Sequence, residues 1–196
     1  RVSCPNPALA APAWTHWRRS TIDCGDRPVK ENEIRVDTAA MTRKAIIVGA
    51  GGQALSLADA AHGLDLDLLG CVAPRLAAGT GDRLAHLGTD LEDTGYHPDQ
   101  ILLLNGIGSA GPIGRRRLVY LELLAQGWQF ISLVHRGAHV SPLAGPLGDG
   151  HQVLAGSVIN AGVRLADNVL VNSGAIIEHG CRIGSHCHVA SGATVC

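Results

Sequence analysis

Aliphatic residues recur every six positions along the last quarter of the chain, in an unbroken series of Leu147, Val153, Ile159, Leu165, Val171, Ile177, Ile183, Val189 and Val195. Four positions after each, from Val153 onward, lies a small or β-branched residue. An α-helix, with about 3.6 residues per turn, and a strand, with a period of two, both lack such a repeat. The series therefore predicts a parallel β-helix in which three hexapeptides form one triangular coil.

Between residues 41 and 133, strand patterns alternate with helix patterns. The fully apolar run at 45–48 and the mainly apolar segments at 66–72, 101–104 and 130–134 predict strands, and apolar residues at helical spacing predict helices over 53–62 and 118–126. Such alternation predicts a parallel sheet with right-handed crossovers.

The first forty residues carry no such periodicity. They hold two of the three tryptophans and four of the nine prolines, and the only methionine, Met41, directly follows them. Two interpretations stay open: residues 1–40 are a non-native extension upstream of a start at Met41, or they are a disordered N-terminal arm. Neither contributes to the predicted fold.

At the other end of the chain, the hexapeptide series stops at Val195–Cys196, in the middle of a repeat. Fewer than three coils are present, and repeat folds are stabilised by several repeats and a capped end. We therefore expect the β-helix to be truncated at its C-terminus, with an open strand edge.

The composition of the 196 residues narrows the class of protein. Aromatic residues make up 3% of the chain, so the core is built from aliphatic side chains. A formal net charge of −1 gives no general attraction to nucleic acid. The chain has no apolar run long enough to span a membrane, and its six cysteines form no CxxC pair. These features predict a cytoplasmic protein.

A glycine-rich loop, 49–52, follows the first predicted strand and precedes the first predicted helix. Its glycines would allow a phosphate or ribose to approach the backbone, although a tight turn without a ligand is the alternative. Ala54 departs from the GxGxxG fingerprint, and Ala73–Pro74 replaces the acidic residue that binds a ribose. A dinucleotide redox function is therefore disfavoured.

A cluster of polar residues, 172–188, lies on the repeats and includes Glu178, His179 and His188. His179 is predicted to face outward near a corner of a coil, where it would be either a general base or a solvated histidine. Metal binding is disfavoured because Cys181 and Cys187 occupy inward positions. Three further basic residues, 115–117, open the last predicted helix and either bind an anion or form a solvated turn.

Three segments resemble a known family. The segments 172–179, 181–184 and 188–193 are similar to the bacterial sugar acyltransferases, a group of sialic-acid O-acetyltransferases and nucleotide-aminosugar N-acetyltransferases. The likeness extends over 41–196 and includes the glycine loop, the segment 106–108 and the segment 135–138.

The resemblance implies a Rossmann-like nucleotide-sugar-binding domain at 41–134 and a left-handed β-helix at 135–196. It also implies a homotrimer with active sites between neighbouring β-helices and acetyl-CoA as co-substrate. By the same resemblance, His179 with its neighbour Glu178 would be catalytic and would deprotonate a sugar amine or hydroxyl for direct attack on the thioester. The remaining residues implied are His188 for acetyl-CoA, and Gly51, Gly52, Gln53 and Gly108 for the sugar substrate. No metal is implied.

The chain departs from this family at four places. Gly180 replaces an acidic residue after the catalytic histidine, Gln53 replaces a histidine, Ala73–Pro74 replaces an acidic pair, and the last coils are missing. A catalytically weak or inactive β-helix that serves as an assembly module is therefore the alternative function. A zinc hydrolase built on a β-helix is a third hypothesis.

Overall fold

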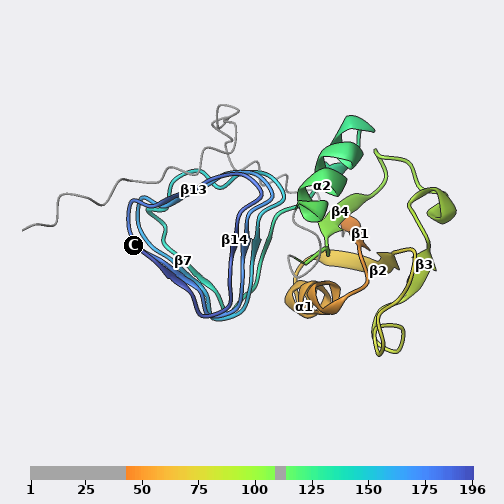
Figure 1. The fold of residues 1–196 in the computed structure, drawn as a ribbon, viewed down its shortest axis with the longest axis horizontal. Helices are drawn as coiled ribbons and strands as arrows, with labels where there is room; N and C mark the ends of the chain where they lie inside the picture. Colours follow the sequence, from red (N-terminus) through yellow and green to blue (C-terminus); the bar gives the residue numbers. More distant parts are fainter. Residues whose placement is uncertain (1–42, 109–113) are drawn as a thin grey trace, which may run out of the picture.

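The computed structural model describes residues 43–108 and 114–196; the predicted extension, 1–40, lies outside the described residues. The chain forms a sheet flanked by helices, and a β-helix lies beside it (Figure 1). In the described part of the chain, no helix is long and apolar enough to cross a membrane.

Five parallel strands form one sheet in the order β3-β2-β1-β4-β5. Its elements, in chain order, are β1 (Arg43–Val48), α1 (Gly52–Ala61), β2 (Leu66–Val72), β3 (His86–Gly88), the short 3-10 helix η1 (Glu92–Thr94), β4 (Leu102–Asn105), α2 (Arg115–Ala125) and β5 (Gln129–Phe130). The predicted alternation of strands and helices and the parallel sheet are confirmed.

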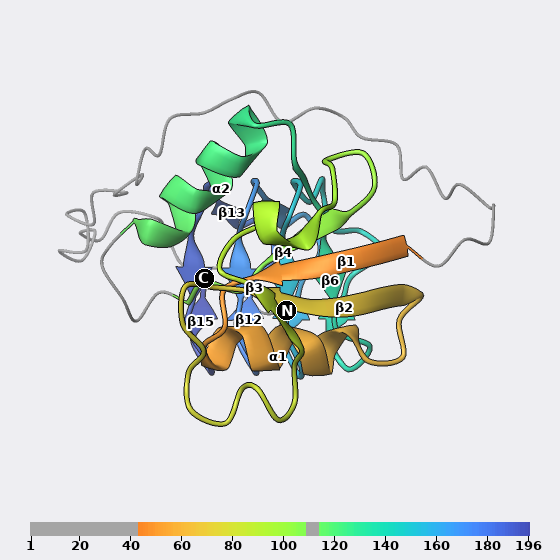
Figure 2. The same cartoon turned by 90° about the vertical axis from the view of Figure 1, so that its right-hand side faces the viewer.

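The two helices cover opposite faces of this sheet (Figure 2). Adjacent strand residues point to opposite faces, so Ile47 packs in the core with α1, whereas Ile46 packs in the core with Tyr120 of α2. Because both faces of the sheet are buried, the segments 45–48 of β1 and 102–104 of β4 are continuously apolar. This is why the sequence shows them as unbroken apolar runs.

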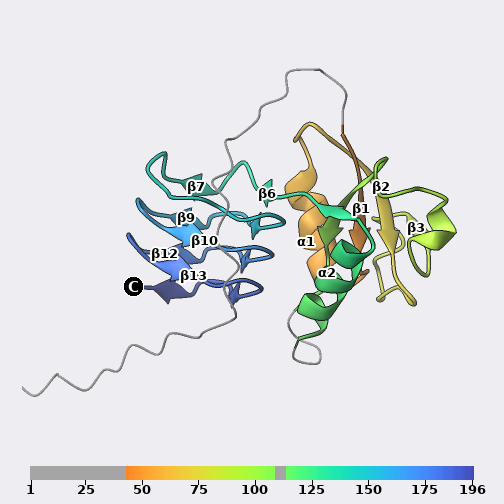
Figure 3. The ribbon, with the colours of Figure 1, turned by 90° about the horizontal axis from the view of Figure 1, so that it is seen from above.

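Three further parallel sheets form the sides of the triangular coils, which stack in Figure 3. The first contains β6 (Leu133–Val134), β8 (Gln152–Val153), β11 (Leu170–Val171) and β14 (His188–Val189); the second contains β7 (His139–Val140), β9 (Val158–Ile159), β12 (Ile176–Ile177) and β15 (Thr194–Val195); the third contains β10 (Arg164–Leu165) and β13 (Arg182–Ile183). Ile159 pairs with Ile177, and Ile177 pairs with Val195. The predicted stacking of the hexapeptides is confirmed.

The run predicted as one strand at 130–134 is two strands in different sheets. Phe130 ends β5, which pairs with β4, whereas Leu133 begins β6, which pairs with β8 of the β-helix. Apolar periodicity detects a strand and does not show which sheet the strand joins, and this is the reason for the error. The division of the chain into domains at residue 134 stays a prediction.

The β-helix and the α/β part share a buried interface. Leu133, Leu154 and Leu170 belong to the same apolar core as the buried face of α1. Beside this core, Asn105 donates a hydrogen bond from Nδ2 to Asn168 Oδ1 at 3.1 Å. Gln152 Nε2 donates to the carbonyl oxygen of Asn105 at 2.9 Å. Asn105 therefore connects the sheet to the corner of the β-helix.

The substitution Asn105→Ala is expected to lower the free energy of unfolding by about 2 to 4 kcal/mol. It removes the donor to Asn168, whose side chain is fully buried, and leaves that oxygen without its partner. Urea unfolding measures the loss. The control Gln129→Ala, at an exposed position, is expected to change stability by less than about 0.5 kcal/mol. An Asn105→Ala midpoint equal to that of the control would contradict the connecting role of Asn105.

Candidate active site

A pocket of about 1980 Å³ opens at the carboxyl ends of the central strands and extends to the β-helix. It lies where the chain order reverses between β1 and β4, the position at which open parallel sheets bind ligands. The loops after these strands approach closely, since a Cβ added at Gly49 would lie 3.0 Å from the backbone of Gly106. The crevice is therefore formed by the backbone of the sheet itself.

Five of the predicted site residues line this pocket together. Gly51, Gly52, Gln53 and Gly108 come from the loops of the sheet, and His188 comes from β14 of the β-helix. The pocket therefore brings the predicted sugar loop and the predicted acetyl-CoA residue to one place within a single chain.

The glycine loop faces open space. A Cβ added at Gly51 or Gly52 would meet no atom within 4 Å, so both residues present bare backbone to the pocket. Gly51 is the N-cap of α1, and no side chain caps the first turn of this helix. Gln53 Nε2 is buried and has no hydrogen-bond partner among the described residues. The loop therefore offers unpaired donors to a ligand.

His188 lies at the β-helix wall of the pocket, where its surroundings lower its pKa. Burial lowers the pKa of His188 below its ordinary value, and the positive charge of Arg116 lowers it further. Asn172 Nδ2 lies 3.1 Å from His188 Nε2 and donates to it, which leaves the ring proton on Nδ1. The lowered pKa favours the uncharged form of the imidazole in this position.

His179 lies outside the pocket, at the turn between β12 and β13, and its side chain is exposed. The α/β part packs on the sheet that contains β14, whereas this turn is the corner on the opposite side of the coils (Figure 1). The neighbouring Glu178 accepts a hydrogen bond at Oε2 from Asn160 Nδ2 at 3.1 Å. One chain therefore does not bring His179 and Glu178 together with His188.

Comparison with known proteins supports the family. A model of the bacterial transferase hexapeptide (six repeats) matches residues 162–196. The structure resembles the acetyltransferase domain of PglB from Neisseria gonorrhoeae in complex with acetyl coenzyme A, with 30% identity and a TM-score of 0.69, over 79% of this chain and 73% of that one. The chain belongs to the bacterial hexapeptide-repeat sugar acyltransferases.

The acyltransferase also resembles GDP-perosamine N-acetyltransferase from Caulobacter crescentus, solved as a histidine-to-alanine mutant with CoA and GDP-perosamine. The identity is 25% and the TM-score is 0.66, over 77% of this chain and 70% of that one. No curated protein matches significantly. These neighbours and the six-residue repeat fit a left-handed β-helix.

The three successive arginines of the acyltransferase have three different environments. Arg115 lines the pocket with an exposed side chain, Arg117 is exposed outside it, and Arg116 is only 5% exposed. Arg116 donates from NH1 to the carbonyl oxygens of Asn105 at 2.6 Å and Ile107 at 3.0 Å. Burial lowers its pKa to about 10. No pattern in the sequence distinguishes the buried Arg116 from its two exposed neighbours.

The pocket of the acyltransferase is also lined by Arg75 and Asp90, which the sequence did not single out. Both lie in loops after strands, and β3, the strand before Asp90, has no apolar run that predicts it. Among the described residues, no group of three His, Cys, Asp or Glu side chains is arranged to hold a metal ion.

Proposed function

We propose that the acyltransferase moves an acetyl group from acetyl-CoA to an amino or hydroxyl group of a nucleotide-linked sugar or of sialic acid. The observation that carries the proposal is the pocket that joins the glycine loop to His188. The PglB domain was solved with acetyl coenzyme A, and the perosamine enzyme with CoA and a nucleotide sugar. We interpret the α/β part as a Rossmann-like nucleotide-sugar-binding domain and the coils as the acyltransferase domain.

In the proposed reaction, His179 is the general base. Its imidazole takes a proton from the acceptor amine or hydroxyl, and the freed lone pair attacks the carbonyl carbon of the thioester. The C–S bond then breaks, and the proton passes to the departing sulfur of CoA. Glu178, fixed by its bond to Asn160, is the carboxylate next to this base in the sequence.

Because His179 lies on the far corner of the coils, the proposed site needs a second copy of the chain. We propose a homotrimer in which His179 of one copy reaches the pocket of its neighbour. The closed symmetry of such an assembly gives every copy the same contact and therefore three equal sites.

An exposed apolar side chain on the same corner supports this arrangement. The amide of Gly180 donates to the carbonyl of Ala161, and the amide of Gly162 donates to that of Leu143. Leu143 therefore occupies, in the first coil, the position that His179 occupies in the third. Leu143 is 74% exposed, and an apolar side chain of this size gains stability when a neighbouring copy covers it.

The direct test is detection of the acetylated product by mass spectrometry. The full chain is incubated with acetyl-CoA and, separately, with UDP- and GDP-linked aminosugars and with sialic acid. We expect an acceptor to gain the mass of one acetyl group, and the mass readout avoids thiol reagents that react with the exposed Cys196. If a folded trimer acetylates no acceptor, the chain functions as an assembly module instead.

A further inference from the structure

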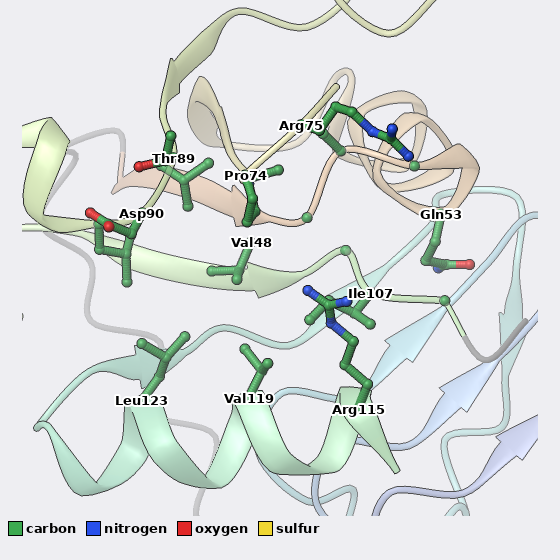
Figure 4. Close-up of a pocket in the computed structure, with 18 of the residues that line it drawn as sticks. Val48, Gln53, Pro74, Arg75, Thr89, Asp90, Ile107, Arg115, Val119 and Leu123 are labelled. Atoms are coloured by element: carbon green, nitrogen blue, oxygen red, sulfur yellow. The ribbon is translucent and has the colours of Figure 1, made fainter. Parts of the chain in front are cut away.

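A series of hydrogen bonds joins the two walls of the pocket behind its lining. Ile107 donates its backbone N–H to Asn105 Oδ1 at 3.2 Å, and Asn105 Nδ2 donates to Asn168 Oδ1 at 3.1 Å. Asn168 Nδ2 lies 2.9 Å from His186 Nδ1. Figure 4 shows Ile107 among the residues that line the pocket, whereas the three side chains lie behind the lining. This hydrogen-bond series therefore starts at the loop after β4 and ends on the β-helix.

Both ends of the hydrogen-bond series lie next to predicted site residues. At one end, Ile107 directly precedes Gly108, a predicted sugar-binding residue. At the other end, His186 lies two residues before His188, in the same coil. The series thus connects the loop that carries Gly108 with the coil that carries the predicted acetyl-CoA residue.

Backbone groups fix the direction of every hydrogen bond in the series. The N–H of Ile107 can only donate, and the carbonyl of Arg116, 3.2 Å from Asn105 Nδ2, can only accept. The amide of Asn105 therefore has one orientation. Asn168 must then turn its oxygen to Asn105 and its nitrogen to His186, where Nδ1 accepts. The opposite orientation of Asn168 would place two donors against each other.

The backbone and the burial of Asn168 suit it to this position. Asn168 lies at the corner before β11 with a φ of 55°, and the equivalent residues of the neighbouring coils, Gly150 and His186, have φ values of 67° and 64°. Asparagine adopts this left-handed conformation more readily than most residues. The side chain is fully buried, so its loss would leave the amide of Asn105 without a replacement acceptor from water.

We propose that Asn168 is a positioning residue of the active site, which acts through Asn105 to hold the loop of Gly108 in alignment with the coil of His188. The inference rests on the proposed function, in which an acceptor at this loop attacks a thioester at His188. Direct attack requires the two reacting atoms to be held about 3 to 3.5 Å apart, and a small displacement slows the reaction. Asn168 lies behind the pocket lining, so its loss should act on kcat and not on substrate binding.

The substitution Asn168→Gly tests the proposal, because glycine keeps the left-handed backbone and removes the side chain. We expect kcat for acetyl transfer to fall by about 10- to 100-fold, and the KM values of both substrates to change by less than about twofold. The matched control is Ser157→Ala. Ser157 is also fully buried in the β-helix, and its hydroxyl donates to the carbonyl of Leu154 at 2.6 Å, outside the hydrogen-bond series. Ser157→Ala is expected to keep the wild-type kcat.

Hydrogen exchange of the loop is a second readout, and it needs no catalysis. Deuterium uptake of the peptide 102–108 is followed by mass spectrometry. We expect the amide of Ile107 to exchange about tenfold faster in Asn168→Gly, the effect of one weakened hydrogen bond, and at the wild-type rate in Ser157→Ala.

Two further variants test the path of the effect. When Asn168→Gly is added to Asn105→Ala, we expect the kcat of Asn105→Ala alone, because the series is already broken. His186→Gly removes the acceptor at the far end, at a partly buried corner, and is expected to lower kcat by about 2- to 10-fold. This variant decides the question if Asn168→Gly does not fold.

Three results would overturn the proposal: wild-type kcat and exchange in Asn168→Gly (or wild-type kcat in His186→Gly, if the first variant does not fold), an equal loss of kcat in Ser157→Ala, or additive losses in the double variant. Failure of the proposed function is distinguishable. A wild type that acetylates no acceptor, but whose loop exchange depends on Asn168, refutes only the proposed function. An active wild type whose kcat and loop exchange survive Asn168→Gly refutes only this inference.

Discussion

The substitution His179→Ala is expected to reduce acetyl transfer by about 10²- to 10⁴-fold, which is the usual contribution of a positioned general base. Without the imidazole, the acceptor amine or hydroxyl must lose its proton to water. The loss should fall on kcat, because a general base acts on the transition state and contributes little to the binding of the substrate. Rates are measured by mass spectrometry of the product at saturating acetyl-CoA.

A matched variant separates this chemical role from damage to the coils. His139, in the short strand β7 of the β-helix, is also an exposed histidine outside the pocket. His139→Ala is expected to keep the wild-type rate. A folded His179→Ala trimer with wild-type kcat would show that another group is the base.

Mixed trimers should recover activity that neither parent variant has. When His179→Ala and His188→Ala chains are co-expressed in equal amounts, we expect about a quarter of the wild-type activity. Each site takes His179 from one copy and His188 from its neighbour, so random assembly leaves both histidines intact in about one site in four. Specific activity of the purified mixed trimers, with their composition checked by native mass spectrometry, is the measurement.

The control for this experiment replaces the His188→Ala partner with a chain that carries both substitutions. No site in those trimers contains His179, so no recovery is expected. Absence of recovery in true mixed trimers of the two single variants would refute a site shared between copies.

The β-helix was predictable because each six-residue repeat of the sequence forms one side of a triangular coil. With an aliphatic residue at every sixth position, each such residue stacks on its counterpart in the next coil. Ile159, Ile177 and Val195 stack in this way. The α/β strands were predictable for a similar reason, since burial on both faces requires continuous apolar residues, as in 45–48. β3 was missed because its three residues carry no such run.

The site was predictable only in part, because pocket formation depends on contacts between distant segments. The glycine loop is recognisable locally, as a strand, glycines and a helix in succession. The burial of Arg116 is not, since it depends on the carbonyl oxygens of Asn105 and Ile107, which only the folded turn places nearby. The catalytic role of His179 stays a prediction, because one chain places it away from the pocket.

The shared core between α1 and the coils has a consequence for how acceptors are chosen. With Leu133, Leu154 and Leu170 packed in the same core as α1, and Asn105 bonded across the interface, the two halves cannot rotate about a hinge. The span from the glycine loop to His188 is therefore constant. In the proposed site, this fixed span predicts that the length of the acceptor, measured from its anchored end, decides which nitrogen or oxygen atom reaches the thioester.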